Sequence, residues 1–204
     1  MSTVRITYFN IRGVAELTRL LFVYSEHDFE DERLEREAWP ARKPESPLGS
    51  VPYIRLENGH EYPQATSIAR YFADKFGLRG KTDEEKLHAD VVVDLVRADI
   101  IPMLTKIFLE QDAEKKESGK KEAQEKIQAW FEKIETKFIK GESTILESGT
   151  SWADIALFNC VNDFFPVFEF KLDEKNVKIN KVVQSVKANP KIAAWLEKRP
   201  ESVL

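Results

Sequence analysis

Cysteine and histidine are scarce in this sequence, and their scarcity excludes two kinds of site. Cys160 is the only cysteine among 204 residues, so neither an intrachain disulfide nor a cysteine-rich metal site can form. The three histidines, His27, His60 and His88, are scattered and lack the spacing of metal ligands. We therefore expect no metal centre.

An excess of basic residues and a long hydrophobic run are also missing. Lys and Arg together number 31 against 35 Asp and Glu, which gives a net charge of −4 and an isoelectric point near 5.6. Proteins that bind nucleic acid through its phosphates are usually basic, so we expect no nucleic acid partner. No stretch is long and apolar enough for a signal peptide or a membrane span, which favours a cytoplasmic protein without a membrane partner.

The sequence does contain enough apolar surface to fold. Hydrophobic types make up 42% of the residues and aromatic types 11%, unlike a disordered chain. The length fits one ordinary domain or two small ones. A change of pattern near residue 80 favours two.

Residues 1–78 carry the pattern of a small α/β domain. Strands are indicated by alternation with period two, and helices by apolar stripes at a spacing of three and four residues. The prolines between residues 39 and 50 exclude a long regular element there, and Asn58-Gly59 is the strongest hairpin signal. The elements expected are strands over residues 5–9, 29–34, 53–56 and 61–62 and helices over 14–25 and 65–76.

Residues 79–82 read as a linker, and residues 83–204 as an all-helical domain. Ser151 and Asp154 match a variant of the capping box, for which a structural role is the best interpretation. Pro190 stands at the preferred first turn of the last helix. The helices expected are near 84–110, 120–140, 151–165, 178–188 and 190–198.

The first domain resembles the thioredoxin-like fold but lacks its catalytic cysteines, since Tyr8 ends the first strand and Cys160 lies far away. At a finer level the chain resembles a sigma-class glutathione transferase of the invertebrate, cytosolic type over nearly its whole length. The motifs that carry this resemblance are Tyr8-Phe9-Asn10-Ile11-Arg12-Gly13 with Ala15-Glu16, Trp39-Pro40, Lys43, Gly49, Val51-Pro52, Gln64, Ile68-Ala69-Arg70-Tyr71, Ser151-Trp152-Ala153-Asp154, and the closing stretch from Ile192 to Trp195 with Lys198-Arg199-Pro200.

The resemblance implies the glutathione transferase fold and the matching activity. Glutathione would be the cosubstrate, with no permanent cofactor, and its sulfur would be added to hydrophobic electrophilic small molecules in detoxification by a cytosolic homodimer. Tyr8 would be the catalytic residue, because its hydroxyl can donate a hydrogen bond to the sulfur anion. Such a bond is worth about 1.5–3 kcal/mol, or roughly one to two pKa units of a thiol that ordinarily titrates near 8.5.

The resemblance also implies two sets of contact residues. Trp39 and Lys43 would meet the glycine end of glutathione, Val51 before a cis Pro52 its cysteinyl backbone, and Gln64 with the amide of Ala65 its γ-glutamyl carboxylate. The glutathione-binding set is Tyr8, Trp39, Lys43, Ser50, Val51, Pro52, Gln64 and Ala65. The electrophile-binding set is Phe9, Val14, Met103, Leu104 and Phe108.

Four positions depart from the pattern of the class. Val14 replaces a frequent arginine, Ser50 a common lysine or glutamine, and Ala65 the serine of a Gln-Ser pair. Ala98 stands where an aspartate normally crosses the dimer interface to the ligand amine. The departures put glutathione affinity in question and leave the expected fold unchanged.

Two other functions stay open at this level. One is a non-catalytic structural or ligand-carrying protein on the same fold, as in lens crystallins. The other is a glutathione-dependent isomerase, although relatives with that activity carry a tryptophan where this chain has Leu104. Taken singly, Tyr8 would be a buried aromatic with a satisfied hydroxyl and Pro52 a trans turn proline.

Overall fold

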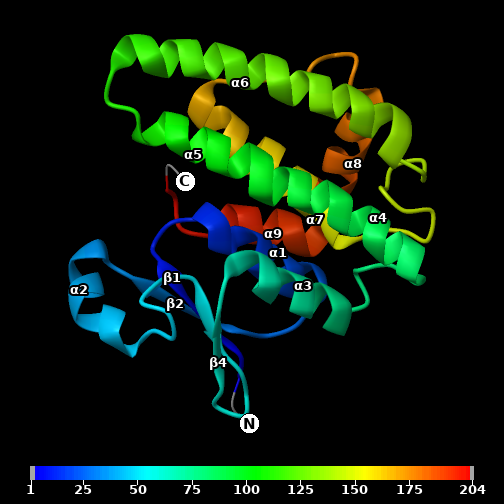
Figure 1. Cartoon of the computed structure of the whole chain (residues 1–204). Helices are drawn as coiled ribbons and strands as arrows, with labels where there is room; N and C mark the ends of the chain where they lie inside the picture. Colours follow the sequence, from blue (N-terminus) through cyan, green and yellow to red (C-terminus); the bar gives the residue numbers. More distant parts are fainter. Residues whose placement is uncertain (1–2, 203–204) are drawn as a thin grey trace. The chain divides into compact units, whose positions relative to one another are not determined.

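The computed structural model describes residues 3–202, which divide into two compact units (Figure 1). The first unit contains the chain up to Phe76 together with the residues from Asn189 onward, and the second is Gly77–Ala188. No helix among the described residues is long and apolar enough to cross a membrane.

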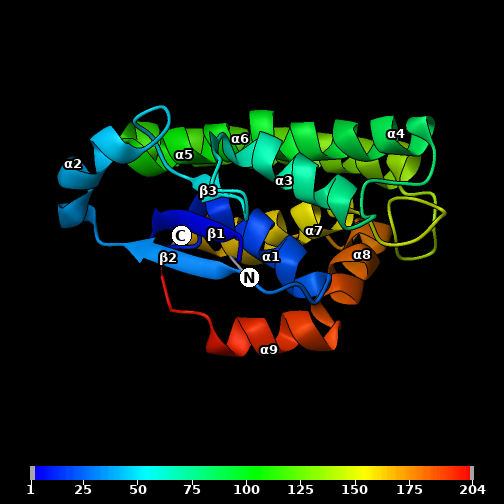
Figure 2. The same ribbon diagram turned by 90° about the horizontal axis from the view of Figure 1, so that it is seen from below.

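The first unit is built on a four-stranded mixed sheet with the strand order β2-β1-β3-β4. β1 pairs in parallel with β2, and the two lie side by side in Figure 2, while the pairs β1–β3 and β3–β4 are antiparallel. Helices α1 (Glu16–Tyr24) and α3 (Ala65–Lys75) pack on the sheet. The strands are β1 (Arg5–Phe9), β2 (Glu30–Leu34), β3 (Tyr53–Arg55) and β4 (Glu61–Pro63).

The core of this unit lies between the sheet and the two helices. Ile6 and Ile54 point from β1 and β3 toward Phe22 of α1 and Phe72 of α3, and the two phenylalanine rings are 4.5 Å apart. The alternating strand pattern and the helical stripes therefore meet as expected. These elements confirm the thioredoxin-like architecture that the sequence predicts.

The proline-rich segment contains only short helical turns. They are η2 (Arg36–Ala38), α2 (Trp39–Arg42) and η3 (Lys43–Glu45). Pro40 and Pro44 each stand in the first turn of such a piece, where a missing N–H does no harm. The prediction that no long element forms here is confirmed.

The second unit is helical throughout its regular elements. Its centre is α7 (Trp152–Asn159), in which every residue is buried. Ser151 and Asp154 form the full capping box at the start of α7, as predicted. The remaining elements are α4 (Asp83–Asp94), η4 (Leu95–Ile100), α5 (Ile101–Leu109), α6 (Ala113–Lys133), η5 (Ile134–Phe138), η6 (Cys160–Phe164), η7 (Phe165–Phe168) and α8 (Val177–Lys187).

The last helix belongs to the first unit in the structure, whereas the sequence places it in the helical domain. The short turn η1 (Gly13–Ala15) connects β1 to α1. Helix α9 (Pro190–Lys198) packs against α1 (Figure 1). The physical reason is a buried contact, because Trp195 and Arg199 both donate hydrogen bonds to Glu16.

Candidate functional site

Tyr8 is held in one place by its neighbours in the first unit. It lies in β1, its side chain is buried, and its backbone is fixed by parallel pairing with Arg33 of β2. Its ring contacts that of Phe9 at a centroid distance of 5.7 Å, and the guanidinium carbon of Arg19 lies 6.0 Å from the Tyr8 ring centroid.

The backbone of Gly13 comes very near to the Tyr8 hydroxyl. Gly13 has a φ of +43°, a left-handed conformation that glycine adopts readily. A Cβ atom on Gly13 would lie 2.8 Å from Oη of Tyr8 and 2.9 Å from its Cε1. A glycine therefore allows the loop before α1 to cover one side of the hydroxyl.

Arg19 fixes this loop from the interior. Its side chain is completely buried, and Nη1 donates to the carbonyl oxygen of Ile11 at 2.9 Å and to that of Arg12 at 3.3 Å. These two carbonyls immediately precede Gly13. The position of Gly13 against Tyr8 thus depends on a buried guanidinium group.

Glu16 is a buried carboxylate that joins α1 to α9. Its Oε1 accepts hydrogen bonds from Nε1 of Trp195 at 2.8 Å and from Nη1 of Arg199 at 2.9 Å, and its Oε2 accepts from Nη1 of Arg19 at 3.2 Å. Burial raises the pKa of Glu16, but attraction to Arg19 and the two other hydrogen bonds outweigh burial, so this pKa lies below its ordinary value. Glu16 is therefore ionised at neutral pH.

Trp39 and Lys43 lie in the segment of short helical turns. Trp39 is half-buried and packs edge to face on Phe9, with ring centroids 5.8 Å apart and planes at 81°. Lys43 is exposed, and its carbon chain passes close to Gly49, where a Cβ atom would lie 3.5 Å from Cε of Lys43. The contact with Gly49 orients the carbon chain of Lys43, while the ammonium group stays accessible to solvent.

Two backbone features mark the residues expected to bind the rest of glutathione. The Val51–Pro52 peptide bond is cis, which confirms that part of the prediction. Gln64 precedes α3 with a φ of +81°, a conformation that side chains rarely adopt and that is found at functional sites. Its side chain makes no capping hydrogen bond, so the amides at the start of α3, from Ala65 onward, are available to an anion.

The residues expected to bind the electrophile have different environments. In the first unit Phe9 and Val14 are half-buried. In the second unit Met103 is half-buried, Phe108 is 36% exposed, and Leu104 is completely buried, as is typical of plain core. Their role toward an electrophile stays a prediction.

Ser50 and Ala98, two of the departures from the class pattern, are exposed. Ala98 lies in η4, a π-helical turn, and the nearby Asp94 and Asp99 are exposed as well. The alanine side chain at position 98 has no polar atom that could bind the amine of a ligand.

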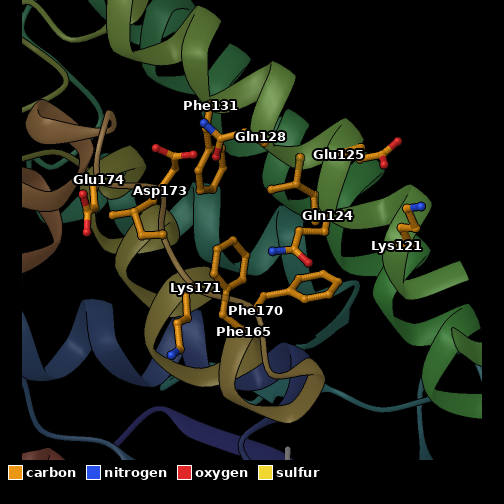
Figure 3. Close-up of a pocket in the computed structure, with 12 residues that line it drawn as sticks. Lys121, Gln124, Glu125, Gln128, Phe131, Phe165, Phe170, Lys171, Asp173 and Glu174 are labelled. Carbon is orange, nitrogen blue, oxygen red and sulfur yellow. The ribbon is translucent and has the colours of Figure 1, made fainter. Parts of the chain in front are cut away.

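A hollow of about 770 Å³ in the second unit contains none of the predicted site residues (Figure 3). Gln128 and Phe131 of α6 face Phe165 and Phe170 across it, while charged side chains of both signs surround it. Phe131 and Phe165 are at most 3% exposed, and their stacked rings have centroids 5.7 Å apart, so they pack mainly against each other. The hollow therefore presents neither a defined charge nor a broad aromatic wall.

Two other buried titratable groups serve the packing of the second unit. Burial raises the pKa of Asp154 to about 6, against the hydrogen bonds that it accepts from Ser151 and Ile145. Burial raises the pKa of Cys160 to about 12, so its thiol is not a nucleophile. No cluster of metal-ligating side chains occurs within residues 3–202.

Sequence reasoning did not assign a role to Glu16, Arg19, Trp195 or Arg199. Glu16 and Arg19 lie three residues apart on the buried face of a helix, where charged side chains are almost never found unless paired. That unusual placement was the available signal. The partners on α9 had no signal of their own, because Trp195 is 179 residues from Glu16 in the chain.

Comparison with known proteins gives consistent results. Residues 98–199 match the family model described as the C-terminal domain of glutathione S-transferase. Glutathione S-transferase 3 of Caenorhabditis elegans is 35% identical, with 97% of each chain covered. Hematopoietic prostaglandin D synthase of Gallus gallus is 33% identical over the full length of both chains. The solved structure of a Fasciola hepatica sigma class transferase has a TM-score of 0.85 at 25% identity and covers 99% of each chain.

Proposed function

The chain belongs to the glutathione S-transferase family, and from that membership we propose that it holds glutathione as a thiolate through Tyr8 and adds the sulfur to hydrophobic electrophilic small molecules. The nucleophile is carried by the cosubstrate, so the protein supplies binding, orientation and a lowered thiol pKa. Detoxification in the cytoplasm is the proposed role.

The surroundings of Tyr8 carry this proposal. The phenol is buried, is approached by Gly13 and lies beside the buried guanidinium group of Arg19. A hydroxyl held in such a position can donate a hydrogen bond to a sulfur anion with little reorganisation. A bond of about 1.5–3 kcal/mol favours the thiolate by roughly 10- to 100-fold.

The rest of glutathione would be bound by the residues that the resemblance implies. The cis peptide at Pro52, the positive φ of Gln64 and the free amides at the start of α3 support this assignment. Ala65 retains a backbone amide for the γ-glutamyl carboxylate. Ser50 contributes only its backbone and a short hydroxyl.

An ultraviolet titration of the bound thiolate against pH tests the proposal. The expected result for the natural chain is a glutathione thiol pKa well below that of the free thiol, with a return toward about 8.5 in Tyr8→Phe. Retention on immobilised glutathione should be nearly the same for both, because only one hydroxyl is removed. An unchanged thiol pKa in the variant would contradict the role of Tyr8.

Failure of the natural chain to bind glutathione would instead favour the non-catalytic alternative, a carrier or structural protein on this fold. The spacing of Trp39, Lys43, Pro52 and Gln64 argues against it. Binding with no thiolate near neutral pH would point to a lost activation step, for which the replacement of the class arginine by Val14 is the first candidate.

We further propose that the chain is a sigma-class homodimer. The likeness to the Fasciola hepatica sigma class structure supports the class. Large exposed apolar side chains support a protein interface, with Tyr62 and Tyr71 near 50% exposed in the first unit and Leu87 at 64% in the second. Light scattering coupled to size exclusion should give twice the mass of 23.6 kDa, and a monomer mass would contradict this proposal.

A glutathione-dependent isomerase is the second candidate function, because one of the similar proteins is named prostaglandin D synthase. Leu104, which stands where such relatives carry a tryptophan, is completely buried. We expect little or no glutathione-dependent formation of prostaglandin D. Turnover comparable to the conjugation of electrophiles would make this second function the better one.

A further inference from the structure

We propose that the C-terminal helix α9 takes part in thiol activation, with Trp195 and Arg199 acting as positioning residues for Tyr8 through Glu16 and Arg19. The inference rests on the proposed function, in which Tyr8 stabilises the thiolate of glutathione. All five residues lie within the first unit. They connect in four steps from the end of the chain to the phenol.

The first step joins α9 to α1. Oε1 of Glu16 accepts both Nε1 of Trp195 and Nη1 of Arg199, which leaves Oε2 for Arg19. The side chain of Glu16 is completely buried, and that of Arg199 is 8% exposed. Charge-assisted hydrogen bonds to a completely buried carboxylate restrict its rotamer, although the two donors from the C-terminal segment are themselves only partly buried.

The second step joins Glu16 to the loop beside Tyr8. Arg19 is completely buried and is held between Glu16 and Asp31, to which its Nε donates at 2.9 Å. Held in this way, its Nη1 donates to the carbonyl oxygens of Ile11 and Arg12. If the Glu16 carboxylate turned, Arg19 would lose one of its two acidic partners, the completely buried one, and with it its fixed direction.

The third step joins the loop to the phenol. The carbonyls that Arg19 holds precede Gly13, whose backbone closely approaches the Tyr8 hydroxyl. The loop is also tied to the end of the chain, because the backbone amide and the guanidinium group of Arg12 donate to Ser202. The C-terminal segment therefore holds the loop beside the Tyr8 hydroxyl in two ways, through the bonds to Glu16 and through Ser202.

The last step is electrostatic. The cluster of charges around Arg19 contains the guanidinium groups of Arg19, Arg33 and Arg199 and the carboxylates of Glu16 and Asp31, none with a side chain more than 18% exposed. It carries one excess positive charge. Arg19 places part of that charge 6.0 Å from the Tyr8 ring centroid. A positive charge at low dielectric favours an anion at the hydroxyl.

Trp195→Phe is the sharpest test, because it removes the Nε1–H donor and keeps an aromatic ring beside Phe29. We expect the thiol pKa of bound glutathione, followed by ultraviolet titration, to rise by about half a unit or more, and kcat near pH 6.5 to fall about threefold or more. The KM for glutathione should stay within about twofold, since none of its proposed contacts changes. Trp130→Phe in α6 is the matched control and should leave all three values unchanged.

A pair of substitutions at Arg199 separates positioning from simple support of the fold. Arg199→Lys keeps the charge beside Glu16 and should retain a thiol pKa near that of the natural chain, whereas Arg199→Met should raise it as Trp195→Phe does. If Trp195→Phe and Arg199→Met lower Tm but leave the thiol pKa and kcat unchanged, α9 only supports the fold and the inference is overturned. Absence of a thiolate signal in the natural chain would overturn the proposed function as well, so the two failures are distinguishable.

Discussion

Replacing Gly13 by alanine tests the geometry at Tyr8 with a single methyl group. The new Cβ atom would lie 2.8 Å from Oη, 2.9 Å from Cε1 and 3.2 Å from Cζ of Tyr8. Two carbon atoms in contact prefer a separation of about 3.5–4.0 Å, so the contacts with Cε1 and Cζ would be too short. Either the loop or the phenol must therefore move by several tenths of an ångström.

The expected size of the effect has two parts. The left-handed backbone at φ +43° costs a non-glycine residue about 1–2 kcal/mol, which appears as lost stability. The displaced hydroxyl weakens its bond to the thiolate, and a misplacement on the order of 1 Å can lower a rate by about 100-fold. We expect kcat/KM to fall by about 10- to 100-fold and the thiol pKa to move toward about 8.5.

Gly59→Ala is the matched control for the backbone part. Gly59 also has a positive φ, +86°, but a Cβ atom there meets nothing within 4 Å. Chemical denaturation should show a loss of stability in both variants, larger in Gly13→Ala because of the added contact with Tyr8. The thiolate titration and kcat/KM should change only in Gly13→Ala. If Gly13→Ala kept the thiol pKa and kcat/KM of the natural chain, the loop would have no control over the Tyr8 hydroxyl, and the reasoning would be refuted.

Three further predictions concern groups outside this loop. Burial raises the pKa of Asp154 from an ordinary value near 3.8 to about 6, so the folded state binds this proton more tightly than the unfolded chain; the free energy of unfolding relative to Asp154→Asn should therefore decrease by up to about 3 kcal/mol as pH rises from 4 to 7 in urea titrations. Cys160, whose pKa burial raises to about 12, should resist a thiol reagent at pH 8 in the folded protein and react fully in denaturant; rapid reaction without denaturant would show that the thiol is accessible. Lys43→Met should raise the KM for glutathione up to about fivefold with kcat unchanged, as expected when an exposed ion pair is lost, whereas Lys120→Met should change neither.

The elements with strong local signals could be predicted from the sequence. β1 occupies the expected residues 5–9, and the hairpin around Asn58-Gly59 forms as its turn residues require. The expected helix over 84–110 is present but is interrupted by the π-helical turn η4, which no local signal marks. Local propensity and periodicity describe nearest neighbours, so such a change of winding, set by packing, lies outside what they encode.

The position of α9 could not be predicted, for the same physical reason. Its apolar stripe and its start at Pro190 indicate a helix, but a stripe does not say which surface it will meet. The docking surface is decided by Glu16, the first residue of α1, because its completely buried carboxylate would be unstable without hydrogen-bond donors. The donors come from Trp195 and Arg199, and this pairing draws the last helix to the first unit.

The candidate site also contains parts that local motifs predict and parts that only the packing reveals. Tyr8, Gln64 and the cis bond before Pro52 were expected from motifs of known spacing, and the structure gives the last two an unusual backbone that composition alone does not suggest. At position 14 the sequence has a valine where the class frequently has an arginine, so one positive charge is absent there. The guanidinium carbon of Arg19 lies 6.0 Å from the Tyr8 ring centroid, so a positive charge is present near the phenol although position 14 carries none.

Burying charged side chains costs desolvation energy, so the cluster around Glu16 and Arg19 calls for an explanation. Replacing a buried ion pair by apolar side chains is often neutral or stabilising, because desolvation offsets much of the attraction. The cluster around Glu16 and Arg19 is therefore weakly explained by stability alone. It is better explained by the orientation of Arg19. Its Nε and Nη1 are held by Asp31 and Glu16, and in this orientation Nη1 also donates to the two carbonyl oxygens that precede Gly13.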